Sequence, residues 1–231
     1  MQEVNLVSVS KPSAYTECNS AEEIVAWAAR VSNPSNQNNT ETASKLIQYL
    51  IKNQHWSPFE MVSLAIEIKT TRDIARQILR HRSFSFQEFS QRYADPTKEL
   101  RFVKREARLQ DDKNRQNSIE TADNDLKENW NMLQYSLIDE ARKIYTWAIH
   151  HGIAKEQARA VLPEGLTESV VIMSGTLRSW IHYCQLRMDK ATQKEHREIA
   201  EMCWEIIGTH FPNVIKAYKE IKTLEEIKKG V

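Results

Sequence analysis

The sequence predicts an α+β protein, a single mixed domain in which a central sheet is flanked by long helices. Segments 61–68 and 169–173 have the alternating or β-branched apolar residues of strands. Segments 126–151 and 191–209 instead have apolar residues at helical spacing. The chain contains 231 residues, 41% of them hydrophobic, and this is enough for one full core. Because no internal repeat or clear linker divides it, we expect one domain over residues 1–231.

Capping residues and polar segments set the expected order of elements. Ser20 followed by Glu23 forms a capping box, and Thr40 can cap the next helix. The polar segment 94–124 has no clear periodicity and is expected to be an excursion or lid. The expected strands are at 4–8, 61–69, 101–104 and 169–173. The expected helices are at 20–31, 40–51, 71–80, 126–151, 154–161, 176–187, 191–209 and from 214 onward, and an aromatic, serine-rich loop follows the helix at 71–80.

Composition excludes several classes of function. The formal net charge is +1, so the chain has no overall attraction for nucleic acid or for an anionic membrane. There are only five glycines, and no two lie within nine residues of each other. This spacing excludes a dinucleotide fingerprint, a P-loop and a nucleophile elbow, each of which needs closely spaced glycines. A phosphate site in this chain must therefore use side chains and helix ends.

The cysteines, histidines and N-terminus predict a reducing compartment and no metal. Three cysteines without a Cys-x-x-Cys pair support neither a disulfide framework nor a zinc knuckle, and no His-x-x-x-His pair occurs. The N-terminal segment lacks a basic region followed by an apolar run. No segment approaches the roughly 18 to 20 apolar residues of a membrane span. We therefore expect a cytoplasmic protein with no membrane partner.

Basic residues are concentrated between Arg72 and Arg108, where ten Lys and Arg residues accompany five Asp and Glu residues. Arg72, Arg76 and Arg80 recur at every fourth position, so like charges crowd one helix face unless an anion binds there. A solvated face relieved by Asp73 also explains this spacing, and the spacing alone favours it. The spacing does not exclude either interpretation.

The segment 80–93, RHRSFSFQEFSQRY, adds further groups that suit a nucleotide. Arg80, Arg82 and Arg92 bracket two serines and Glu88. A guanidinium group can donate two parallel hydrogen bonds to the oxygens of one phosphate. Hydroxyls and a carboxylate can bind the polar edge of a base or sugar. These residues predict an anionic, nucleotide-like ligand, although a sulfated or phosphorylated small molecule would fit the same groups.

This segment resembles the signature of the flavin-dependent thymidylate synthases, Arg-His-Arg-x-x-Ser-x-Asn-x-x-Ser-x-Arg-Tyr. Seven of the eight fixed positions match, and Gln87 stands in place of the asparagine. Three other segments are similar to elements of that family, in the same order. They are HWSPFE at 55–60, ARAVLP at 158–163 and RSWIHYCQLR at 178–187. The resemblance thus extends from residue 55 to about residue 205.

The resemblance implies reductive methylation of dUMP to dTMP, with methylenetetrahydrofolate as carbon donor, FAD as hydride carrier and NADPH as reductant. It also implies a homotetramer whose active sites combine residues from several subunits. The matching family arginine favours loss of the uracil ring proton, so Arg187 is expected to be catalytic. The implied dUMP contacts are Gln77, Arg80, Glu88, Ser90, Arg92, Arg159 and Arg187. The implied FAD contacts are His55, Ser57, Arg80, His81, Arg82, Glu88, Thr176, Arg178 and His182.

A non-enzymatic nucleotide- or RNA-binding module is the alternative from another functional class. In it, the basic segment Arg72–Arg108 would hold phosphates, and the aromatic residues of segment 84–93 would stack on bases. That module would bind oligonucleotides with a steep salt dependence and would need no flavin. The segments at 55–60, 158–163 and 178–187 have no role in it, so the enzyme is favoured.

Two residues are candidate nucleophiles, and we expect neither to act as one. Ser90 has no histidine at a spacing that would clearly activate it, so a binding role is favoured. Cys184 lies within a helical pattern and is expected to be a buried structural cysteine. Cofactor chemistry would instead explain the absence of a visible triad.

Overall fold

The computed structural model describes the backbone of residues 2–229 and the side chains of residues 2–221. Its main sheet has four strands in the order β1-β2-β6-β3, and every neighbouring pair is antiparallel. The strands are β1 (Glu3–Val9), β2 (Ser63–Thr71), β3 (Ser85–Glu88) and β6 (Glu168–Thr176). β2 and β6 are therefore central, and β3 forms one edge. This arrangement confirms the predicted mixed α and β architecture.

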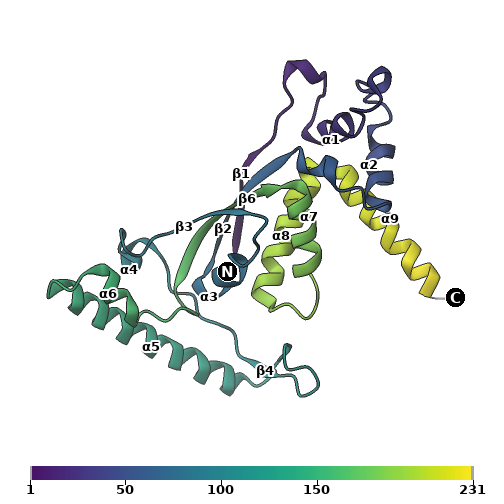
Figure 1. Ribbon diagram of the computed structural model, residues 1–231. Helices are drawn as coiled ribbons and strands as arrows, with labels where there is room; N and C mark the ends of the chain where they lie inside the picture. The colour runs from purple at the N-terminus through teal and green to yellow at the C-terminus, as the bar shows by residue number, and fades with distance from the viewer. Residues whose placement is uncertain (1, 230–231) are drawn as a thin grey trace.

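The helices surround this sheet unequally. α7, α8 and α9 lie together on one side of the molecule with α1 and α2, whereas α5 and α6 lie apart from them (Figure 1). The helices are α1 (Ala21–Ala29), α2 (Ala43–Lys52), α3 (Arg72–Ile78), α4 (Pro96–Glu99), α5 (Asn124–His150), α6 (Lys155–Ala158), α7 (Leu177–Arg187), α8 (Lys194–His210) and α9 (Pro212–Lys229). None of those described is long and apolar enough to cross a membrane.

The core lies between the sheet and the helices α7, α8 and α9. Leu64, Ile66 and Ile68 alternate along β2, and each is at most 2% exposed, as the period of a strand requires. Trp180 of α7 is fully buried among them, and its indole Nε1 donates a 3.0 Å hydrogen bond to the carbonyl oxygen of Leu64. This bond satisfies the polar end of a buried aromatic ring and joins α7 to the sheet.

α5 has two apolar faces, of which only one is covered. Tyr145 and Ala148 on the inner face pack with Ala158 and Leu162 in a small second core. The residues of the other face recur at intervals of three, four, seven and three, and each is at least 41% exposed. We call this the outer face of α5, and it consists of Trp130, Leu133, Leu137, Ile144 and Trp147.

The predicted caps are only partly confirmed. Ser20 Oγ accepts a hydrogen bond from the Glu23 amide, but the Glu23 carboxylate returns to the amide of Asn19 instead of that of Ser20. The prediction that Thr40 caps the second helix is wrong, because α2 begins at Ala43 and Thr42 occupies the cap position without a capping bond. The Thr42 hydroxyl instead accepts a 2.8 Å hydrogen bond from Arg30.

Two segments differ from the expected elements because of non-local pairing. Within the predicted loop after residue 80, residues 85–88 form β3, which pairs with β6 from Ser85↔Ser174 to Glu88↔Val171. The strand expected at 101–104 is reduced to one bridge, Phe102↔Thr167. The excursion 94–124 contains instead the hairpin of β4 (Arg108–Gln110) and β5 (Ser118–Glu120).

Candidate functional site

The signature segment 80–93 joins α3 to the edge of the sheet and lies against the start of α7. Because β3 pairs with β6, and α7 follows β6 directly, the turn before β3 meets the first turn of α7. Ser179 Oγ donates a 3.3 Å hydrogen bond to the carbonyl oxygen of Ser83. A Cβ at Gly175 would lie 2.5 Å from Cδ1 of Phe84, so only glycine allows the aromatic ring to approach β6 this closely.

Arg187, at the end of α7, contacts the signature directly. Its Nε atom donates a 2.9 Å hydrogen bond to Nε2 of His81. Burial, followed by the charges of Arg187 and Arg80, lowers the pKa of His81 to about 4. His81 is therefore neutral near pH 7 and can accept this bond. Arg187, the predicted catalytic residue, is thus hydrogen-bonded to His81, one of the predicted flavin contacts.

Gln77 lies one turn before the signature and is half-buried, in a polar cluster that runs from the exposed Gln193 to the buried His196. Its Nε2 donates to Oε1 of Gln193 at 2.9 Å, and its Oε1 lies 3.2 Å from Nδ1 of His196. His196 is fully buried, and its Nε2 lies 3.2 Å from the hydroxyl of Tyr183. Sequence reasoning missed Gln193 and His196, because neither belongs to a motif and only the packing of α8 beside α3 brings them to Gln77.

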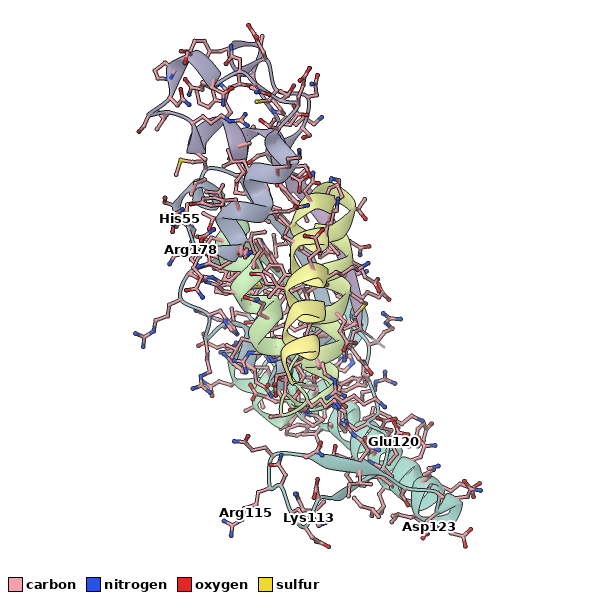
Figure 2. The ribbon with its side chains drawn as sticks, turned by 90° about the vertical axis from the view of Figure 1, so that its right-hand side faces the viewer. His55, Lys113, Arg115, Glu120, Asp123 and Arg178 are labelled. Carbon is pink, nitrogen blue, oxygen red and sulfur yellow. The ribbon has the colours of Figure 1, made fainter. Side chains whose placement is uncertain are left out.

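A second group forms where η3 (Ser57–Glu60), the turn that carries Ser57, meets α7. Arg178 pairs with Glu60, and the ring of Trp56 lies edge-on to that of His182 with 4.7 Å between their centroids. Figure 2 shows Arg178 and the exposed His55 toward the same end of the molecule, well away from the β4–β5 hairpin.

Thr176 has a local structural role that the sequence did not suggest. It is the N-cap of α7, and its Oγ1 accepts a 3.3 Å hydrogen bond from the amide of Ser179. A second Ser179 contact, Oγ to Oγ1 at 3.2 Å, also occupies this hydroxyl. Thr176 therefore stabilises the first turn of α7, the helix that carries Arg178 and His182.

The remaining predicted nucleotide residues form a third group at the β3 edge. Glu88 accepts a 2.9 Å hydrogen bond from Ser169 Oγ and lies 3.5 Å from the guanidinium of Arg72. Arg92 pairs with Glu156 at 3.3 Å, and Arg159 donates to the Glu156 carbonyl oxygen at 3.3 Å. The structure thus brings Arg92 and Arg159 to one place through a residue that the motifs do not include.

The candidate nucleophiles lack the contacts that would activate them. Ser90 Oγ accepts a weak 3.4 Å hydrogen bond from the amide of Arg92, and among the described residues it has no histidine partner. Cys184 is fully buried, and burial and the neighbouring Cys203 hold the pKa of its thiol well above the usual value. The prediction that Cys184 is a buried cysteine is confirmed.

Most arginines of the basic segment are neutralised within the chain. Arg80 and Arg82 are exposed, and neither forms an ion pair with a carboxylate in the described part of the chain. Six others bind carboxylates, and the pairs are Arg72 with Glu88, Arg76 with Glu164, Arg92 with Glu156, Arg101 with Glu168, Arg105 with Asp73 and Arg108 with Glu195. The two arginines of this segment that form no ion pair with a described carboxylate thus both lie at the start of the signature.

A cavity of about 690 Å³ lies elsewhere, between the β4–β5 hairpin and the starts of α5 and α8. None of the predicted site residues lines it, although Gln193, the partner of Gln77, does. No cluster of three or more His, Cys, Asp or Glu that could hold a metal ion occurs among the described residues. In one chain, the predicted site residues therefore form three groups on α3, α7 and the β3 edge.

Comparisons with known proteins agree with the motifs. The family model described as "Thymidylate synthase complementing protein" matches residues 14–213. The chain is 49% identical over 212 residues to a probable flavin-dependent thymidylate synthase of Paramecium bursaria Chlorella virus 1, covering 92% of this chain and 96% of that protein. It is 47% identical over 217 residues to the flavin-dependent thymidylate synthase of Synechocystis sp., covering 93% and 98%.

A solved structure also resembles the whole chain. A UMP/dUMP methylase, PolB, from Streptomyces cacaoi, crystallised with 5-Br UMP, superposes with a TM-score of 0.76 at 25% identity. The match covers 95% of this chain and 94% of that one. The same methylase bound with 5-Br dUMP gives the same TM-score. The signature segment, the family match and the two close relatives together establish that this chain belongs to the thymidylate synthase complementing protein family, the flavin-dependent thymidylate synthases.

Proposed function

We propose that this chain converts dUMP to dTMP by reductive methylation, with FAD as hydride carrier and methylenetetrahydrofolate and NADPH as co-substrates. The contact between Arg187 and His81 is the observation that supports this most directly. It joins the arginine expected at the uracil ring to the signature expected at the flavin. The names of the relatives and of the dUMP-binding neighbour support the same reaction.

The nucleotide would be held by cations and hydrogen-bonding groups from all three groups of residues. Arg80 is exposed and pairs with no carboxylate in the described part of the chain, so its charge is available for a phosphate. Arg187 would place its positive charge beside the uracil ring and favour loss of the ring proton, since a fixed cation stabilises developing negative charge. Gln77, Glu88, Ser90, Arg92 and Arg159 complete the proposed dUMP contacts.

The residues proposed for FAD fit a dinucleotide that combines an anionic pyrophosphate with an aromatic ring. Arg82 is exposed and forms no ion pair with any described carboxylate, and the Nε atom of Arg178 is buried without a hydrogen-bond partner among the described residues. A buried donor without an acceptor costs free energy, and a bound ligand could supply the acceptor. FAD supplies the hydride transfer when bound. His55, Ser57, Arg80, His81, Arg82, Glu88, Thr176, Arg178 and His182 are the residues that we propose to hold it.

The enzyme is proposed to act as a homotetramer with shared active sites. The outer face of α5 leaves Leu133 65% exposed and Trp147 57% exposed, which is costly for a free monomer in water. Apolar residues at this heptad-like spacing suit packing against another helix. The three separate groups of site residues also suit a site that neighbouring subunits complete. Both observations support the assembly.

The visible absorption spectrum tests this function first. The protein is incubated with FAD, freed of unbound flavin and then titrated with dUMP. Retained flavin bands that shift on adding dUMP would support one site for both ligands, and conversion of dUMP to dTMP would then be assayed with folate and NADPH. A colourless protein that binds oligonucleotides with a steep salt dependence would instead support the nucleotide- or RNA-binding alternative.

A further inference from the structure

A continuous chain of hydrogen bonds runs from the excursion 94–124 to the core and passes through Gln77. Glu195 Oε1 binds Arg108 and lies 3.3 Å from Arg105, and Glu195 Oε2 accepts a 3.0 Å bond from Nε2 of Gln193. Gln193 Oε1 then accepts from Gln77. Beyond Gln77 the chain continues through His196 to Tyr183.

The direction of every hydrogen bond in this chain follows from the negative charge of the Glu195 carboxylate. Burial alone would raise the pKa of Glu195, but the hydrogen bond from Arg108 and the charge of Arg105 outweigh it and lower the pKa. An ionised carboxylate can only accept hydrogen bonds. Gln193 must therefore point its amide nitrogen toward Glu195, and its oxygen toward Gln77.

The same reasoning extends to the next two residues. Because Gln193 presents an oxygen, Gln77 must point its nitrogen toward Gln193 and its oxygen toward His196. An amide oxygen only accepts, so the neutral imidazole must hold its proton on Nδ1. Its Nε2 is then free to accept from the Tyr183 hydroxyl, which burial keeps protonated by raising its pKa well above the usual value.

We propose that the carboxylate of Glu195 is a positioning group that fixes, through Gln193, which end of the Gln77 amide faces the nucleotide. With this polarity, one N–H of Gln77 remains for an acceptor on dUMP after the other is used on Gln193. The reversed amide would present an oxygen, which phosphate and carbonyl oxygens repel. The inference rests on the proposed function in one respect, that Gln77 contacts the nucleotide.

The tautomer of His196 tests the polarity without any substrate. Protein labelled with ¹⁵N-histidine and loaded with FAD gives separate nitrogen signals for the two neutral tautomers, and the variant His196→Asn identifies the signal. Wild-type protein should show the Nδ1–H form alone. Glu195→Gln should show a mixture, because a glutamine can accept or donate and no longer sets the direction. The Nε2–H form in wild-type protein would overturn the inference.

Binding of dUMP tests the consequence, and Glu106→Gln is the matched control. Glu106 undergoes the same isosteric loss of charge and also pairs with Lys194 and Arg108, but it lies outside the chain. Glu195→Gln should raise the KM for dUMP about five- to tenfold, as expected for one neutral hydrogen bond, and leave kcat nearly unchanged. Glu106→Gln should stay within about twofold of wild type. Equal KM values for the two variants would contradict the proposal.

A second pair of variants, both at His196, tests the proposal even where Glu195→Gln does not fold. The side-chain nitrogen of asparagine occupies the place of Nδ1, so His196→Asn should retain most of the affinity for dUMP. His196→Leu cannot donate to Gln77 and should raise the KM as Glu195→Gln does. If wild-type protein neither binds nor methylates dUMP, the proposed function fails, whereas the tautomer spectrum still decides the polarity of the chain.

Discussion

Arg187 donates from Nε to Nε2 of His81 at 2.9 Å, which leaves the two terminal nitrogens of its guanidinium for other acceptors. The bond fixes the arginine at the end of α7 against the signature segment. His81 is itself enclosed by aromatic residues, with the Tyr183 ring edge-on at 4.9 Å between centroids. The predicted catalytic cation is therefore held in one orientation before any ligand binds, as electrostatic catalysis requires.

Arg187→Ala is expected to abolish most turnover of dUMP while FAD remains bound. Loss of a fixed cation beside developing negative charge should lower kcat about 10²- to 10³-fold. Steady-state assays and the flavin spectrum measure the two effects. Arg115→Ala is the control, because Arg115 lies on the β4–β5 hairpin (Figure 2) and is none of the proposed site residues, and it should behave as wild type. Unchanged turnover in Arg187→Ala would show that Arg187 is not the catalytic residue.

His81 is expected to act on turnover through Arg187. His81→Leu removes the acceptor and should lower kcat by about tenfold, the cost of freeing a positioned charge. His81→Gln can offer an amide oxygen near the position of Nε2 and should recover part of that loss. Equal kcat values in the two variants would show that the hydrogen bond does not position the arginine.

Ser90→Ala should retain measurable activity, because none of the described residues contacts the Ser90 hydroxyl as a base. The loss should be about tenfold or less in kcat/KM, the value of one hydrogen bond to a ligand. Complete loss of turnover with normal dUMP affinity would instead indicate a nucleophile. Cys184→Ala should also be active wherever it folds, since its thiol is fully buried.

Stability should decrease as the pH falls below about 6.5. Burial lowers the pKa of His81 to about 4 and that of His196 to about 3, in each case with a further contribution from Arg187. Between the ordinary value of 6.5 and these values, the unfolded chain binds protons that the folded chain does not, so protonation favours unfolding. Urea unfolding midpoints at pH 7.5 and pH 5 measure this. A midpoint that rises at the lower pH would contradict the burial of both imidazoles.

Leu137→Glu is expected to dissociate the proposed tetramer and to remove activity with it. A charge in an apolar helix interface is unpaired and strongly unfavourable. Light scattering gives the molar mass, and the dUMP assay gives the activity. Tyr135→Glu is the matched control, since Tyr135 is 64% exposed on α5 but lies outside the outer face. Identical molar masses for both variants and wild type would place the interface elsewhere.

The sequence alone determined the order of most elements, because their signals are local. The apolar alternation along β2 and the helical spacing of the apolar residues along α8 are examples. The dense signature at 80–93 also identified the family, since its fixed residues lie within fourteen consecutive positions. Local patterns of this kind need no knowledge of what packs beside them.

Which residues support the site depends on contacts between segments that are far apart in the sequence. β3 exists because β6, far along the chain, supplies its hydrogen-bonding partner, so the residues 85–88 alone read as a loop. Arg92 and Arg159 meet through Glu156, and Gln77 meets His196, because separate helices pack together. The orientation of the Gln77 amide depends on a carboxylate two hydrogen bonds away, on α8. The orientation of such a side chain is set by contacts between distant segments, and no local sequence pattern predicts those contacts.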